Sequence, residues 1–506
     1  MSIPYIGKEF TFIQPDGTEL KVRGFGNQEN AVFETLDGFT ITRDPETGFY
    51  QYAALSNDGE LVPTGYQAER ADPKNLGLTK GIRANRTAAA LSDLNSDSTR
   101  KTRWQTRREI ARKEKLAELE AGPADPAAPA DIAPQRRTVG DFVGLCLLID
   151  FPDVPGTIPR EDVEAFCNQP DFTKFGNNGS VRDYFFDNSG GKLHYTNIVA
   201  PYYTAKHNRE HYTDENENFP DLAQELIKEA LDSLKADGFD FSPLTVDAQG
   251  FVYATNIFYA GDNPNHHFRT GLWPHFGIMP HFQLMPGKTV ADYQITNMGE
   301  ELTLGTFCHE NGHMVCSFPD LYDFQRNSHG VGAFCLMCNG LDVDQKNPTQ
   351  INAYLKFQAG WADSVTNITA GLNASVRAGV NDFYILRKNQ TEYFIIENRQ
   401  QTGRDQALRA SGLAIWHVDE FGNNDNQAMT PTSHYECSLE QADGEFDFER
   451  LEPNQPYGDA NDLFHGGGNT RFGNDTNPNS RWWDGTPSGL NITIISDNGS
   501  IITFVT

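Results

Sequence analysis

Residues 306–324, TFCHENGHMVCSFPDLYDF, are the part of this sequence that could carry chemistry. His309 and His313 stand four residues apart, and Glu310 directly follows the first. On a helix, positions four apart share a face, so both imidazoles would reach one ion. Two imidazoles suit Zn²⁺, and Glu310 could then take a proton from a water that the metal activates. The alternative is an ordinary polar helix face, because an HExxH pattern also arises by chance.

A zinc site of this kind needs a third protein ligand. A glutamate on a following helix, as in some zinc proteases, is excluded because no glutamate occurs between Glu310 and Glu392. The compact alternative, used in metzincins, places the ligand ten residues after the first histidine. Pro319 occupies that position and cannot coordinate, whereas Asp320 can, so we expect Asp320 as the third ligand. The other candidates for this position are Asp323, His329 and Cys316.

Several further polar residues have weaker claims to chemistry. Asp459, Asp462 and Asp475 lie in Gly- and Asn-rich loops, where carboxylates could bind Ca²⁺. Surface turns would give the same pattern, and both interpretations stay open. His275 and His417 have apolar neighbours and are predicted to be packed histidines with a hydrogen bond each.

Composition limits the class of protein. A chain of 506 residues indicates several domains, and the formal net charge of −28 argues against binding to nucleic acid or to an anionic membrane. The longest apolar run, residues 142–149, is far too short to span a membrane. Seven cysteines, with a single CxxC pair, do not indicate a disulfide scaffold or a zinc ribbon. The N-terminus shows no signal peptide, although the acidic composition favours a secreted or extracellular protein.

The sequence pattern predicts a multidomain α+β protein. Residues 1–93 form short runs separated by Pro-Asp-Gly and Leu-Asp-Gly turns, which is typical of a β-rich domain. Residues 94–137 combine a Pro/Ala-rich linker with a basic run, residues 100–115, that is typical of a solvated helix face or an exposed linker. Residues 138–362 alternate strand and helix patterns, and residues 363–506 alternate apolar and polar positions, which predicts an α/β domain followed by a β-sandwich.

Two elements of the α/β segment are well marked. VGLCLLIDF is a continuous apolar run, as expected of a strand buried on both faces. FPDLAQELIKEALDSLKADGF has the period of an amphipathic helix. The residues predicted on its buried face are Leu222, Leu226, Ile227, Ala230 and Leu234.

Nearly the whole sequence resembles one protein family. HENGHMVCSFPDLYD, GVGAFCLMCNG and NPTQINAYLKFQAGW are similar to the HExGHxxGxPDLYD motif, the Met-turn and the block that follows it in the M6 metalloproteases, the immune inhibitor A-like enzymes. LCLLIDFPDV, GLAIWHVDE and GDANDLF are similar to further blocks of that family. GKEFTFIQPDGTELKVRGFG resembles its pro-domain.

The resemblance implies a zinc-dependent endopeptidase that is made as a zymogen. His309 and His313 would be zinc ligands, Glu310 the general base and Met337 the Met-turn residue below the metal. PDLYD aligns Asp320 with the third ligand. The catalytic domain would be metzincin-like, its substrates would be proteins or peptides, and the pro-domain would act as an intramolecular inhibitor until cleavage within residues 100–137.

The sequence departs from the family motif after His313. One additional residue precedes Pro319, and Cys316 or Ser317 stands where Gly is usual. A residue other than Gly resists a left-handed turn, so we expect the loop to differ. The altered loop leaves two alternatives to the protease: a non-catalytic adhesin or binding protein on a degenerate metalloprotease scaffold, and a zinc amidase acting on cell-wall amides.

Overall fold

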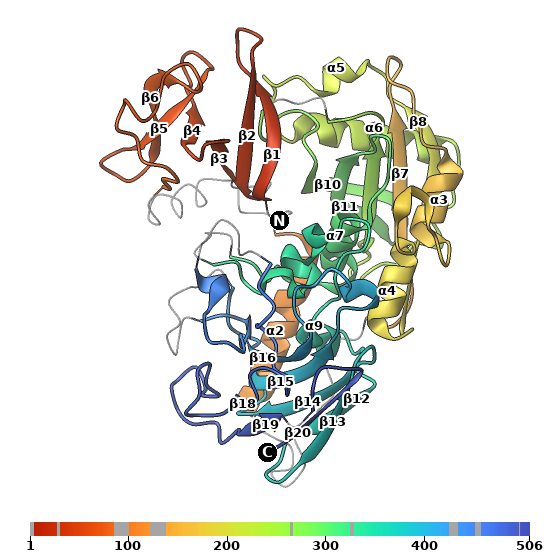
Figure 1. The fold of residues 1–506 in the computed structure, drawn as a ribbon. Coiled ribbons are helices and arrows are strands. Elements are labelled where there is room, and N and C mark those ends of the chain that lie inside the picture. Colours follow the sequence, from red (N-terminus) through yellow and green to blue (C-terminus); the bar gives the residue numbers. More distant parts are fainter. Residues whose placement is uncertain are drawn as a thin grey trace.

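The computed structural model is a mixed α/β protein whose strands form several sheets (Figure 1). The structure describes residues 5–27, 31–84, 101–121, 138–263, 267–323, 328–424, 434–450, 457–494 and 496–506. Among the helices of these residues, none has the length and apolar character needed to cross a membrane.

The N-terminal sheet is an antiparallel meander of six strands in sequence order. Its strands are β1 (Tyr5–Ile13), β2 (Glu19–Gly26), β3 (Ala31–Thr35), β4 (Thr40–Arg43), β5 (Tyr50–Leu55) and β6 (Leu61–Gln67). The predicted turns after β1 and β3 contain Gly17 and Gly38, both with positive φ. The ring of Phe10 stacks on Trp273, with centroids 5.5 Å apart, so this sheet is docked on the segment before β10.

A five-stranded sheet supports the histidine motif, in the order β10-β11-β9-β7-β8. Its strands are β7 (Gly140–Asp150), β8 (Leu193–Thr204), β9 (Thr255–Tyr259), β10 (His275–Met285) and β11 (Lys288–Asn297). The edge strand β10 runs antiparallel to β11, whereas the other pairs are parallel. The predicted buried strand is β7, and it lies between β8 and β9.

Helices cover both faces of this sheet, which explains the continuous apolar run of β7. Leu145 and Leu147 pack in one core with α6 (Asp221–Ala236), whose predicted apolar residues are all buried. Cys146 and Leu148 point to the other face and pack in a second core. Among the helices that contribute to that core are α3 (Arg160–Asn168), α4 (Val181–Ser189), α7 (Leu304–Cys316) and α9 (Ala353–Gln358). The remaining short helices are α5 (Arg209–Tyr212) and α8 (Leu341–Val343).

The C-terminal part contains two further sheets. The five-stranded one comprises β12 (Ser364–Asn367), β14 (Asp382–Arg387), β15 (Glu392–Arg399), β16 (Gly412–Asp419) and β17 (Cys437–Leu439). The four-stranded one comprises β13 (Asn373–Arg377), β20 (Ile501–Val505), β19 (Ile492–Ile494) and β18 (Arg471–Phe472). Phe394 and Ile396 of the first share a core with Val376 and Phe504 of the second, so the two sheets pack face to face.

The predicted alternation of buried and exposed positions is wrong for β15, where every residue is buried. The reason is that Tyr393 and Ile395 pack on Phe357 of α9, which covers the second face of this strand. Its polar residues are therefore paired. The guanidinium of Arg399 contacts both carboxylate oxygens of Asp405, at 2.6 and 2.7 Å, and donates to the main-chain carbonyl of Phe334 at 2.8 Å.

Removing Arg399 should destabilise the fold severely. Arg399→Ala leaves the carboxylate of Asp405 buried without its partner, and such losses lower the free energy of unfolding by about 3–5 kcal/mol. Arg377→Ala is the matched control, because Arg377 pairs with Asp382 while 58% of its side chain is exposed. Urea unfolding should show a loss of less than about 1 kcal/mol for the control. Equal losses in the two variants would contradict the assignment.

The basic run forms α2 (Arg103–Ala121), which lies against the body of the protein (Figure 1). The prediction of a solvated helix face or exposed linker is wrong, because Arg107, Arg108 and Lys115 are only 13–14% exposed. Arg108 pairs with Glu436 and Lys115 with Glu420. Acidic groups of later segments therefore neutralise the run. The predicted cleavage region extends beyond α2 into residues that lie outside the described ones, and it stays a prediction.

Candidate metal centre

The histidine motif lies on α7, which follows β11 and packs beneath the five-stranded sheet. Leu304, Phe307, Cys308 and Val315 are buried in the core, as their helical spacing predicts. They anchor the helix, and the neighbouring face bears the two histidines. The side chains of His309, His313 and Asp320 are fully buried.

Three ligand atoms meet at one point in this interior. The Nε2 atoms of His309 and His313 are 3.2 Å apart, and Oδ1 of Asp320 lies 3.1 Å from the first and 3.2 Å from the second. Three ligands of a tetrahedral Zn²⁺ at about 2.0 Å would be separated by about 3.3 Å. The three atoms therefore have the spacing of one face of a zinc tetrahedron.

Main-chain carbonyls fix the orientation of both imidazoles. Nδ1 of His309 lies 3.0 Å from the carbonyl oxygen of Leu336, and Nδ1 of His313 lies 2.6 Å from that of Phe318. A ring whose Nδ1–H donates to a carbonyl has an unprotonated Nε2 that can bind a metal. The two Nε2 lone pairs and the Asp320 carboxylate would repel one another unless a positive charge lies between them.

The electrostatics of the group agree with this requirement. Burial lowers the pKa of His309, but the hydrogen bond and negative charge of Asp320 outweigh burial, so the pKa is raised. Burial raises the pKa of Asp320, yet the charge of His313 and the contacts with both imidazoles hold it well below its ordinary value. The shifts of His309 and Asp320 thus both favour positive charge at the shared point, which a proton or a metal ion can supply.

The turn after α7 explains how Asp320 reaches the histidines. The helix ends at Cys316, and Ser317 adopts the left-handed conformation with φ 56° and ψ 33°. The amides of Ser317 and Phe318 donate to the carbonyls of His313 and Gly312 and close the turn. Ser317-Phe318-Pro319-Asp320 therefore aligns with Gly-x-Pro-Asp of the motif that the sequence resembles, with Ser317 in the left-handed position.

Met337, the predicted Met-turn residue, lies against α7 beside Gly312. It belongs to a buried π-helical turn, Leu336–Gly340, which also supplies the carbonyl that orients His309. A Cβ atom on Gly312 would come within 2.8 Å of the Met337 sulfur. Gly312 therefore permits the close approach of this turn to α7, and the sequence spacing alone gives no sign of that contact.

Glu310 carries an unusual buried carboxylate. Neither of its oxygens has a hydrogen-bond partner among the described residues, and the residue is 2% exposed. Burial raises the pKa of this carboxyl, while the charges of His309 and His313 act in the opposite direction. A carboxylate that is held near a metal site without protein partners is free to accept and release a proton.

The other candidates for the third ligand do not join the group. Among the described residues, the potential ligand atoms within 4.8 Å of one another at this site belong to His309, His313 and Asp320 alone. Burial raises the pKa of the Cys316 thiol well above its ordinary value, which disfavours the thiolate that a metal would bind.

The packed histidines are confirmed as such. His275 is buried, with Nδ1 2.6 Å from the carbonyl oxygen of Trp273 and Nε2 2.8 Å from the hydroxyl of Tyr293. His417 is buried 3.3 Å from Glu392. All seven cysteines are free and buried, including the CxxC pair.

The predicted calcium ligands are brought together only in part. Asp459 and Asp462 lie close to each other, but their third partner is Asp443. Asp475 is not part of this group and lies 3.8 Å from Arg471. Sequence spacing could not reveal Asp443, because it lies far from the other two in the sequence.

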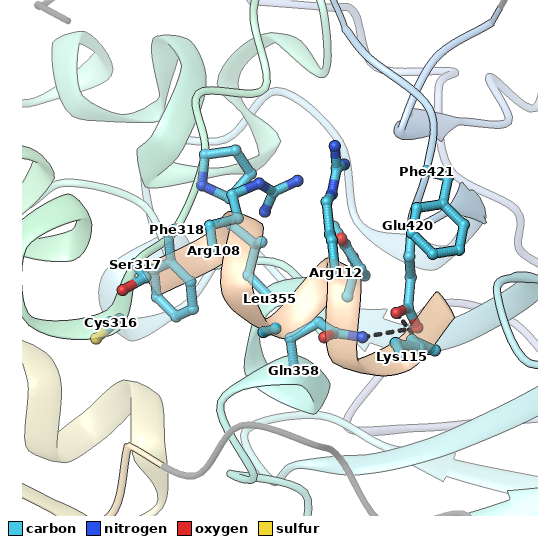
Figure 2. Close-up of a pocket in the computed structure, with 13 residues that line it drawn as sticks. Arg108, Arg112, Lys115, Cys316, Ser317, Phe318, Leu355, Gln358, Glu420 and Phe421 are labelled. Carbon is cyan, nitrogen blue, oxygen red and sulfur yellow. Dashed lines mark hydrogen bonds and ion pairs between the residues drawn. The ribbon is translucent and has the colours of Figure 1, made fainter. Parts of the chain in front are cut away.

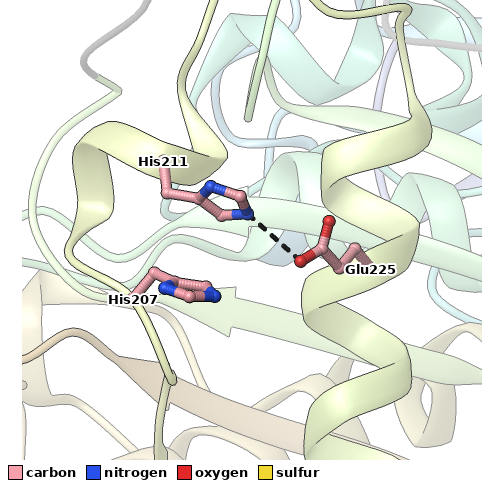
Figure 3. A group of neighbouring side chains, drawn as sticks. All are labelled: His207, His211 and Glu225. Carbon is pink, nitrogen blue, oxygen red and sulfur yellow. Dashed lines mark hydrogen bonds and ion pairs between the residues drawn. The ribbon is translucent and has the colours of Figure 1, made fainter.

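A further group of potential ligands was missed by the sequence analysis. His207, His211 and Glu225 are exposed, and His211 Nε2 lies 3.1 Å from a Glu225 oxygen (Figure 3). The HNREH spacing places the two histidines four residues apart, which was the available signal. Exposed groups of this kind are common in proteins without a bound metal.

Helix α2 packs directly against the histidine site. The indole of Trp104 stacks on the His313 ring, with centroids 4.7 Å apart and planes at 20°. The Arg107 guanidinium donates to the Met314 carbonyl at 2.5 Å and to the Ser317 hydroxyl at 3.1 Å. Figure 2 shows the next turns of α2 beside Cys316–Phe318, with Lys115 and Gln358 both directed at Glu420. The end of α7 is thus covered by the basic helix.

This arrangement can bind a divalent cation through two imidazoles and a carboxylate, with a second carboxylate available for proton transfer. The ligands, their orienting carbonyls and the supporting Met337 come from three segments: α7, the turn that follows it, and the π-helical turn Leu336–Gly340. No protein-family model matches the chain, and no curated protein shows significant similarity to it.

Proposed function

We propose that this protein is a zinc-dependent endopeptidase made as a zymogen. The observation that carries the proposal is the triangle formed by His309 Nε2, His313 Nε2 and Asp320 Oδ1, with edges of 3.1–3.2 Å. Glu310 directly follows the first ligand and keeps a buried carboxylate without a hydrogen-bond partner among the described residues.

Zinc is the metal that this ligand set fits best. Imidazole nitrogen suits borderline-soft ions such as Zn²⁺, while Ca²⁺ and Mg²⁺ prefer oxygen ligands alone. Three protein ligands also leave a tetrahedral ion with one open position, which is typical of catalytic rather than structural zinc sites. When bound, Zn²⁺ would acidify a water and polarise the carbonyl of the scissile peptide bond.

The residues of the chain have separate tasks in this proposal. Glu310 accepts the proton of the attacking water and delivers it to the nitrogen of the leaving amine. The raised pKa of its carboxyl favours this double role, because a group that is too acidic would hold the proton too weakly to transfer it. The carbonyls of Leu336 and Phe318 hold the imidazoles in the orientation that ligation requires.

Two contacts support the zymogen part of the proposal. Trp104 of α2 lies on the ring of His313, so a substrate could reach that side of the site only after α2 has moved. The N-terminal sheet adds a second contact region, where the Tyr50 hydroxyl lies 3.1 Å from Nδ1 of His267. We therefore assign residues 1–93 as an inhibitory pro-domain and α2 as the part of the linker that covers the site.

The resemblance to the M6 metalloproteases supports the same assignment. The metzincin-like catalytic domain would comprise residues 138–362, and a β-sandwich-like domain residues 363–506. The acidic composition supports a secreted or extracellular protein, and the substrates would be proteins or peptides.

The proposal is tested by metal content and proteolysis together. We expect one zinc per chain by mass spectrometry, no cleavage of unfolded casein by the intact chain, and cleavage after limited trypsin treatment. Zinc with no proteolysis after trypsin would overturn the endopeptidase, and digestion of peptidoglycan would then identify the amidase. Absence of zinc from protein purified with zinc in the buffer would favour a binding protein.

A further inference from the structure

A second cluster of ligands lies at the far side of the Met-turn, in the loops between β17 and β18. Carboxylate oxygens of Asp443, Asp459 and Asp462 all lie within 4.8 Å of one another. The charge of Asp447 also acts on Asp462. Four acidic residues therefore share one small region of the protein, and Asp447 and Asp462 are buried.

Only one of the two carboxylate oxygens of Asp462 has a hydrogen-bond partner among the described residues. Asp462 is 0% exposed, and its Oδ2 accepts a hydrogen bond from the Asp459 amide at 2.6 Å. Its Oδ1 is buried and has no hydrogen-bond partner among the described residues. A buried carboxylate oxygen without a donor is strongly unfavourable unless a cation or a proton is bound to it.

The surrounding charges do not compensate for the cluster. Among the described residues, no Lys or Arg forms an ion pair with Asp443, Asp459 or Asp462. The pKa of Asp462 is raised to about 8, chiefly by burial and in part by the negative charges of Asp443, Asp459 and Asp447. Burial also raises the pKa of Asp443 and of Asp447. Buried carboxylates whose charges are not neutralised by Lys or Arg are expected at a cation site.

We infer that Asp443, Asp459 and Asp462 bind a Ca²⁺ ion. All available ligands are oxygens, which suit Ca²⁺, whereas Zn²⁺ prefers nitrogen and sulfur ligands. Ca²⁺ tolerates irregular geometry and can complete its shell with water and main-chain carbonyls, whereas Mg²⁺ demands a near-ideal octahedron. This ion would be distinct from the zinc of the proposed active site, and its binding does not depend on proteolysis.

The location gives the calcium ion a structural role near the proposed active site. Phe448 lies in the same loop and packs on Phe334, with ring centroids 6.1 Å apart. The Phe448 carbonyl accepts a hydrogen bond from the His329 amide at 2.7 Å. Phe334 directly precedes the turn that holds Met337. A bound Ca²⁺ would therefore stabilise the loop whose Phe448 packs against the segment before the Met-turn.

The test uses the full chain, stripped of calcium by dialysis and kept at one equivalent of zinc. Adding CaCl₂ to a hundred-fold excess over Kd should raise Tm by roughly 2–3 °C, and MgCl₂ should raise it much less. Asp462→Asn should abolish the calcium response. Asp475→Asn is the matched control, because Asp475 was an equally plausible ligand by sequence, and this variant should respond like the unmodified chain.

Two readouts separate a lost site from a misfolded variant. Asp462→Asn should fold normally by circular dichroism. Asp443→Asn should weaken calcium binding at least ten-fold by calorimetry. Absence of any calcium response in the unmodified chain, or its loss in Asp475→Asn, would overturn the inference.

Discussion

Glu310→Gln should lower casein cleavage by the trypsin-treated chain by about 10²–10⁴-fold, the usual contribution of a general base. The amide has nearly the shape of the carboxylate, so the zinc ligands stay in place, but it cannot accept the proton of the attacking water. One zinc per chain should remain. Because neither oxygen of Glu310 has a partner among the described residues, the substitution also removes a buried charge at little structural loss. Tm should therefore stay equal or rise.

Glu301→Gln is the matched control for this experiment. Glu301 lies just before α7 and pairs with Lys346 at 2.7 Å, with 51% of its side chain exposed. Its replacement should leave activity, zinc content and Tm nearly unchanged. If Glu310→Gln retained full activity with zinc bound, the assignment of Glu310 as the base would be wrong, although the metal site itself would survive.

Asp320→Asn should weaken zinc binding by more than about 100-fold, since even substitutions of residues that merely orient a ligand lower metal affinity by about 10–100-fold. The amide keeps the shape of Asp320 but removes the negative charge that faces both imidazoles at 3.1–3.2 Å. Competition with a chromophoric chelator measures the affinity directly. Proteolysis should disappear at low zinc and return in part at high zinc.

Asp323→Asn distinguishes a ligand from a buried acid of the same loop. Asp323 is 3% exposed but lies outside the group of potential ligands. Its replacement should leave zinc affinity within a few-fold of the unmodified chain. Equal losses of affinity in Asp320→Asn and Asp323→Asn would show that the loop as a whole, and not the Asp320 carboxylate, determines metal binding.

The local elements and the members of the candidate metal site could be predicted from the sequence because their signals are local. Residues four apart on a helix must share a face, so His309 and His313 needed no knowledge of the fold. The apolar run of β7 and the amphipathic pattern of α6 likewise indicate which of their residues are buried. Asp320 could be predicted because it follows within a few residues of the helix end.

The failures concern residues whose surroundings come from distant parts of the chain. The basic run of α2 looked solvated because its partners, such as Glu436 and Asp247, lie more than a hundred residues away. β15 appeared to have an exposed face because its own sequence gives no indication that α9 packs on it. Asp443 was missed for the same reason, while Asp475 was included only because it is near in sequence.

The position of α2 has a consequence for how a cleaved chain would behave. While the chain is continuous, the tether holds the helix near its groove at an effective concentration of roughly millimolar. A cut between Ala121 and Thr138 would leave residues 1–121 attached only by noncovalent contacts, among them the pairs of Arg108 with Glu436 and Lys115 with Glu420. Cleavage and activation of the proposed protease are then separate events. The cleaved protein would remain inactive at high protein concentration and become active on dilution below the dissociation constant of its own N-terminal fragment.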